Sequence, residues 1–171
     1  MSASAIPPHH LPGDRIAGLG TAGMFVIAAL RLWAGERAGR PLKVTWRDGF
    51  EAAGLDLAAQ VDWDVLLAIL NNAPAGPLVV SGMHDPRLCV DECAMLRLLE
   101  AFQRGDVAWG ATLLVRRLDL DIAGDALPRA RNLARALDGV GLGLTSPGRE
   151  RVRMRDHGRF VGPPVTAVTL H

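Results

Sequence analysis

The sequence predicts a mainly α-helical protein, a single-domain irregular helical bundle of about five to six helices with a short extended or hairpin C-terminal tail. Alanine and leucine are abundant, runs of β-branched residues are short, and apolar residues recur at helical spacing. At 171 residues the chain can bury a core without a disulfide or a metal. We expect a disordered lead over residues 1–15, a helical domain over 16–144 and a basic tail over 145–171.

The first predicted helix, residues 22–38, is apolar on all sides. Such a helix is either buried at the centre of a fold or spans a membrane. The uncharged stretch 16–30 is shorter than the roughly 20 residues of a membrane helix, and Arg31 ends it. We therefore expect a core helix and no membrane association. The N-terminus has no basic segment followed by an apolar one, so we expect a cytoplasmic protein.

The next segment contains two candidate helices. A weak one over residues 47–59 is broken by Gly54. Asp62 is expected to cap a second helix, which ends at the proline-rich stretch 74–77. Residues 78–81 are then expected to be extended.

The second half of the helical domain is predicted from caps and breakers. Residues 90–104 form the clearest helix, and Asp106 is expected to cap another that continues to about residue 118. Asp125 is expected to cap the last helix, with Pro128 in its first turn, where the missing N–H does no harm. Glycines from Gly139 onward end it.

The stretch MHDPRLCVDEC, residues 83–93, raises the question of a metal or thiol site. His84, Cys89 and Cys93 are three candidate metal ligands, but a structural zinc site needs four. His157 or His171 would have to complete it. Alternatively, Cys89 and Cys93 are reactive thiols, or Cys89 simply occupies the N-cap position of the following helix.

A helical wheel places the remaining residues of helix 90–104 around its core stripe, which contains Met95, Leu96, Leu98, Leu99 and Phe102. Cys93 lies roughly 150° from the centre of the stripe and is expected on the outer face. Asp91, Glu92 and Gln103 lie within about 60° of the centre. The two acids stabilise the helix N-terminus, or the three residues line a polar pocket or bind an arginine of a partner.

The tail is the basic part of the chain. Its arginines include Arg151, Arg153 and Arg155, which would project from one face of a strand. That face could contact a phosphate or an acidic partner, but it could also be a solvated edge that blocks strand pairing. We favour the edge, because no ladder of aromatic residues is present to stack bases. The pI of 7.9 likewise does not predict a nucleic-acid-binding domain.

Motifs for catalysis are absent from the sequence. There is no G-x-S-x-G, H-E-x-x-H or phosphate-binding glycine loop. The composition alone would allow a catalytic dyad of Cys89 with His84 or His157, but no motif supports one. We therefore assign no catalytic residues, expect no cofactor, and do not expect an enzyme.

One resemblance covers two segments, LCVDECAMLRLLEAFQRGD and ALRLWAGERAGR. They resemble a group of small uncharacterised helical proteins of α-proteobacteria, in which an acidic D-E pair opens a leucine-rich helix that ends in Q-x-G. Asp91, Glu92, Gln103 and Gly105 match that pattern. Cys89 stands where the group would have serine or threonine. The resemblance implies a helical fold and no particular activity.

The first functional hypothesis is a small regulatory or scaffold protein that acts through protein–protein contact. The partner would be an unknown protein, or a second copy of the chain in a homodimer. One alternative is a thiol- or metal-responsive protein that uses Cys89, Cys93 and His84. The other is weak binding of a polyanion or nucleic acid through the arginine-rich tail.

Overall fold

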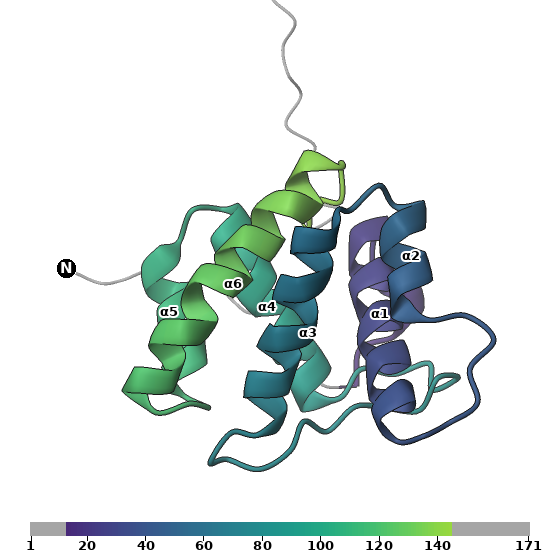
Figure 1. The fold of residues 1–171 in the computed structure, drawn as a ribbon, viewed down its shortest axis with the longest axis horizontal. Coiled ribbons are helices and arrows are strands. Elements are labelled where there is room, and N and C mark those ends of the chain that lie inside the picture. Colours follow the sequence, from purple (N-terminus) through teal and green to yellow (C-terminus); the bar gives the residue numbers. More distant parts are fainter. Residues whose placement is uncertain (1–12, 145–171) are drawn as a thin grey trace, which may run out of the picture.

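The computed structural model describes residues 13–144, which form a helical bundle (Figure 1). This confirms the mainly α prediction. The described part contains no strand, and residues 78–81 form none; Arg15 and Arg87 make a single antiparallel bridge. The hairpin expected in the tail lies outside the described residues. After a short 3₁₀ turn the helices are α1 Thr21–Arg37, α2 Trp46–Ala52, α3 Leu57–Asn71, α4 Val90–Gln103, α5 Val107–Val115 and α6 Leu120–Gly139.

Helix α1 is a core helix, as its all-round hydrophobicity predicts. Val26, Ile27, Leu30 and Trp33 are buried, whereas Met24 and Ala28 on the other side of the helix are exposed. The helix packs against α2 and α4. No helix within residues 13–144 has the length and apolar character needed to cross a bilayer.

Two short-range signals divide α2 from α3. Gly54 adopts a positive φ of 77°, which ends α2 because residues with a side chain rarely adopt that conformation. Asp56 then caps α3 by accepting a hydrogen bond from the amide of Ala59 at 2.8 Å. The prediction that Asp62 caps this helix is wrong, since Asp62 lies within α3. Asp56 offers the same capping chemistry earlier, and the residues after it are good helix formers.

The predicted bounds of α4 and the cap of α5 agree with the structure. Cys89 occupies the N-cap position of α4, and the Asp106 carboxylate accepts from the amide of Trp109 at 3.0 Å. Gly110 allows α5 to approach α4 closely. A Cβ atom at this position would lie 2.5 Å from the ring of Phe102. A larger residue at position 110 would therefore force the two helices apart.

Helix α6 begins at Leu120, and its N-cap residue is Asp119 rather than the predicted Asp125. Asp125 and Pro128 therefore lie in the helix interior. Proline there removes the hydrogen bond to the carbonyl four residues earlier. The helix continues because its opposite face, which includes Ala126 and Ala130, is fully buried.

Helix α4 lies between two groups of helices. It contacts α1, which packs with α2, and it also contacts α5 and α6. Helix α3 packs along α6, and the two helices run side by side in opposite directions (Figure 1). This arrangement covers α4 on several sides and leaves Leu57, Ala58 and Val61, in the first turns of α3, exposed to solvent.

Candidate functional site: the groove between α3 and α6

Glu92 forms a buried ion pair with an arginine of its own chain. The Arg31 guanidinium donates to it at 2.7 and 3.2 Å, and both side chains are almost fully buried. Arg31 also donates to the carbonyl oxygens of Asp85 and Arg87. Burial by itself would raise the pKa of Glu92, but hydrogen bonds from Arg31 and from the amide of Cys89 outweigh burial and lower the pKa.

Asp91 is likewise bound within the chain. It accepts from Arg117 at 3.0 Å and from the amide of Val79 at 2.7 Å. Arg117 also donates to the carbonyl oxygens of Leu70 and Gly76. The two acids at the start of α4 therefore fix the long connection between α3 and α4. The arginines that bind them, Arg31 and Arg117, belong to the same chain and not to a partner.

Gln103 lies at the other end of α4 and does not share a pocket with the two acids. Its amide group donates to the carbonyl oxygens of Ala134 and Leu142 and accepts from the amide of Leu144 at 2.7 Å. Gln103 thereby holds the chain that follows α6. Gln103 lies eleven positions after Glu92 along the helix, which corresponds to about 16 Å.

The prediction that Cys93 faces outward is wrong, because its exposed fraction is 1%. The wheel considered α4 alone, whereas the folded chain covers this face as well; Glu100 on the same face is also buried and pairs with Arg104. Burial raises the pKa of the Cys93 thiol to about 11. Cys89 is partly exposed, and its thiol donates to the carbonyl of Val79 at 2.9 Å.

These surroundings predict different reactivities for the two thiols. In the native protein, Cys89 should react with a thiol reagent at least about tenfold faster than Cys93, because the nucleophile is the thiolate and burial disfavours it at Cys93. The measurement is the rate at which the one remaining thiol reacts in the Cys89→Ser and Cys93→Ser variants, before and after denaturation. Equal native rates would show that Cys93 is accessible.

The three suggested metal ligands do not form a cluster. Among the residues of the described range, no three His, Cys, Asp or Glu side chains are grouped so as to hold a metal ion. His84 is exposed on the connection between α3 and α4. His157 and His171, which would complete the site, and Arg151, Arg153 and Arg155 lie outside the described residues.

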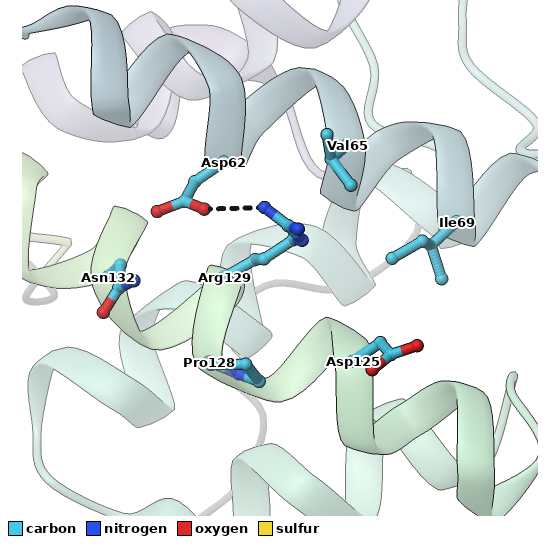
Figure 2. A pocket seen from close by; sticks show the side chains of 7 residues that line it. All are labelled: Asp62, Val65, Ile69, Asp125, Pro128, Arg129 and Asn132. Atoms are coloured by element: carbon cyan, nitrogen blue, oxygen red, sulfur yellow. Dashed lines mark hydrogen bonds and ion pairs between the residues drawn. The ribbon is translucent and has the colours of Figure 1, made fainter.

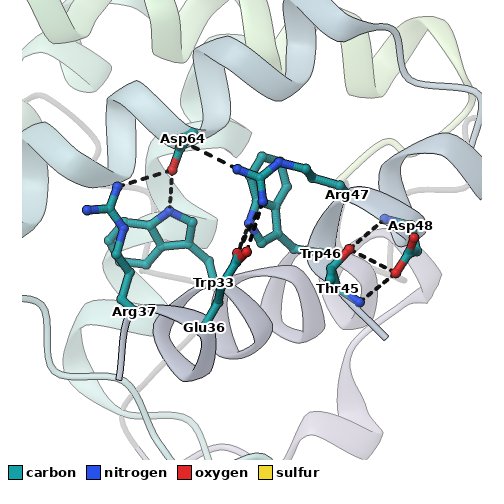
Figure 3. Close-up of polar contacts among 8 residues, drawn as sticks. All are labelled: Trp33, Glu36, Arg37, Thr45, Trp46, Arg47, Asp48 and Asp64. Atoms are coloured by element: carbon teal, nitrogen blue, oxygen red, sulfur yellow. Dashed lines mark hydrogen bonds and ion pairs between the residues drawn. The ribbon is translucent and has the colours of Figure 1, made fainter. Parts of the chain in front are cut away.

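Two tryptophans are held by carboxylates where α1, α2 and α3 meet (Figure 3). Trp33 donates to Asp64 at 2.7 Å, and Trp46 donates to Glu36 at 2.8 Å. Arg47 lies over the Trp46 ring and pairs with Glu36. Both indole N–H groups of this cluster donate hydrogen bonds within the chain. The cluster therefore joins the three helices.

An apolar stripe runs along the solvent side of α3. Leu57, Val61, Val65 and Ile69 are four residues apart and therefore share one face of the helix. Leu57 is 73% exposed and Val61 is 48% exposed, whereas Val65 and Ile69 are half-buried. The sequence prediction missed this stripe, because a helix capped by Asp62 excludes Leu57 and Val61. The four-residue spacing and the possible cap at Asp56 are the sequence features that could have revealed it.

Val65 and Ile69, the C-terminal half of the stripe, form one wall of a groove of about 490 Å³ (Figure 2). Asp62 of α3 and Arg129 of α6 form an ion pair across it at 3.1 Å. Pro128 adds apolar surface from α6, and exposed Asp125 and Asn132 lie along the same helix. The groove thus combines an apolar wall with a polar rim of both charges.

Comparisons of the chain with protein-family models, with curated proteins and with solved structures gave no match.

Proposed function

We propose that this protein is a small regulatory or scaffold protein that binds an amphipathic helical segment of a partner protein along α3 and in the groove between α3 and α6. The observation that carries the proposal is the exposure of Leu57 and Val61 on a stripe that continues into the groove. Contiguous exposed apolar surface rimmed by polar residues is characteristic of protein-binding sites.

The shape of this surface suits a helix. From Leu57 to Ile69 the stripe spans about 18 Å, or roughly three helical turns. A helix lying in a groove presents apolar anchors at spacings of three and four residues, which can pack between those of α3. An apolar centre with charges at the rim is the usual arrangement of a protein interface.

The charges of the rim indicate the polarity of the partner. The groove is lined by two acids, Asp62 and Asp125, against the single base Arg129. Arg129 already pairs with Asp62, while no ion pair within residues 13–144 involves Asp125. A partner with a basic residue opposite Asp125 would therefore gain an attractive contact.

Site-specific photo-crosslinking in the native cells tests the proposal. A photoreactive phenylalanine analogue at Val61 should give a crosslinked species of higher mass that contains a second protein. The same analogue at Ala52, an exposed position of α2, should not give this species. Combining the analogue at Val61 with Leu57→Asp should abolish the species, because the charge lies in the apolar stripe.

A matched variant controls for a general effect of surface charge. Val79→Asp places the same charge on another exposed valine, in the connection between α3 and α4, and should leave the crosslink unchanged. The absence of a crosslinked protein at Val61, or an equal yield at Ala52, would contradict binding along α3.

The alternative functions have less support from the described geometry. A thiol-responsive role would depend on Cys89, since Cys93 is buried, and the three suggested metal ligands are not grouped. A polyanion-binding role depends on arginines outside the described residues. Both stay predictions, to be tested by thiol titration with elemental analysis and by salt-dependent binding to nucleic acid.

A further inference from the structure

Helix α5 carries a second exposed surface, separate from the α3 stripe. Its nine residues include no charged side chain, yet only Gly110 and Leu114 are fully buried. Trp109 is 41% exposed and Val115 is 43% exposed. The exposed face consists of Ala108, Trp109, Thr112, Val115 and the adjoining Arg116.

The residues of this face are arranged symmetrically about Thr112. Trp109 lies three residues before it and Val115 three residues after it, while Ala108 and Arg116 lie four residues before and after. If two copies of α5 cross in opposite directions at Thr112, Trp109 of each copy packs on Val115 of the other. A twofold interface has this property, because the same patch must complement itself.

The charges at the ends of α5 also complement each other in that arrangement. Asp106 is the N-cap residue and Arg116 the C-cap residue, and neither takes part in an ion pair within residues 13–144. Antiparallel crossing brings Arg116 of one copy toward the Asp106 end of the other. It also sets the two helix dipoles in opposite directions, which is favourable.

We propose that the chain forms a twofold symmetric homodimer through the exposed face of α5, with Thr112 at the symmetry axis. The small side chains of Ala108 and Thr112 allow the two helices to approach closely. Arg116 lies over the ring of Trp109, with the guanidinium carbon Cζ 5.2 Å from the ring centre. The arginine thus places a positive charge at the edge of the apolar contact. This dimer is independent of the partner site on α3.

The association state of the full-length chain tests the dimer. Sedimentation equilibrium at micromolar concentrations should give a dimer for the wild type. Val115→Glu should weaken the dimer by about tenfold or more, since it places a charge against Trp109 of the second copy. Val90→Glu makes the same change at an exposed valine of α4 and should leave the dimer intact. Circular dichroism verifies that each variant is folded.

A crosslink at the symmetry axis gives a second, direct measurement. Thr112→Cys should form an intermolecular disulfide under mild oxidation faster than the wild type, because a residue on a twofold axis meets its own copy. A monomeric wild type, a dimer unaffected by Val115→Glu, or a rate of crosslinking equal to that of the wild type would each overturn the proposal. The photo-crosslink at Val61 should persist in Val115→Glu, so failure of the dimer is distinguishable from failure of partner binding on α3.

Discussion

Replacing Glu92 with alanine should lower the free energy of unfolding by about 3–5 kcal/mol, measured by urea denaturation. The change leaves the Arg31 guanidinium buried without its counter-charge. It also removes the carboxylate that accepts hydrogen bonds from the amides of Ser81 and Cys89. Most of the loss arises from the unpaired buried charge rather than from the pair itself.

Two comparisons test this explanation. The double variant Arg31→Met with Glu92→Leu should be less destabilised than the sum of the two single variants, because it removes both charges together. Arg37→Met removes an arginine from an exposed ion pair on the same helix, and it should cost at most about 1 kcal/mol. A loss below about 1 kcal/mol in Glu92→Ala would show that the pair does not fix the connection between α3 and α4.

The effect of Glu92 should also depend on pH. Its pKa is lower in the folded chain than the ordinary value of 4.5, so the ionised carboxylate stabilises the fold above that pH. This contribution is lost as the pH falls through the lowered folded-state pKa. The difference in unfolding free energy between the wild type and Glu92→Ala should therefore shrink in acid, and a difference that grew would contradict the assignment.

Replacing Ile27 with aspartate should destabilise the fold by more than about 4 kcal/mol and abolish soluble expression. Ile27 is 1% exposed in the middle of α1, where the new carboxylate would replace apolar contacts and be removed from water. Soluble yield and, where protein is obtained, thermal unfolding are the measurements. Protonation of the carboxyl group would reduce the charge penalty but not restore the packing.

A neighbouring residue of α1 provides the control. Met24→Asp introduces the same charge at an exposed position one turn earlier and should change stability by no more than about 1 kcal/mol. If both variants expressed equally well, α1 would not be the core helix that its surroundings indicate. If the wild type resisted alkaline extraction from membranes, the core-helix assignment would be contradicted as well.

Local signals in the sequence determined most helix positions. The hydrophobicity of α1 predicted its burial, because an apolar helix that is too short to span a membrane has to be enclosed by the fold. Gly54 divided α2 from α3 because a positive φ favours glycine, and Asp106 capped α5 as its side chain chemistry predicts. Where several aspartates could serve as caps, as at Asp56 and Asp62, local chemistry alone did not choose between them.

Tertiary packing decided the orientation and environment of the side chains. A helical wheel describes one helix in isolation, so it placed Cys93 on an outer face that the folded chain covers. The sequence indicated that Glu92 belongs near the start of α4, but only the fold brought Arg31 to it from 61 residues away. Pro128 is tolerated inside α6 because packing of the opposite face offsets one lost hydrogen bond. Capping and periodicity act over a few residues, whereas burial and charge pairing depend on segments that become neighbours only when the chain folds.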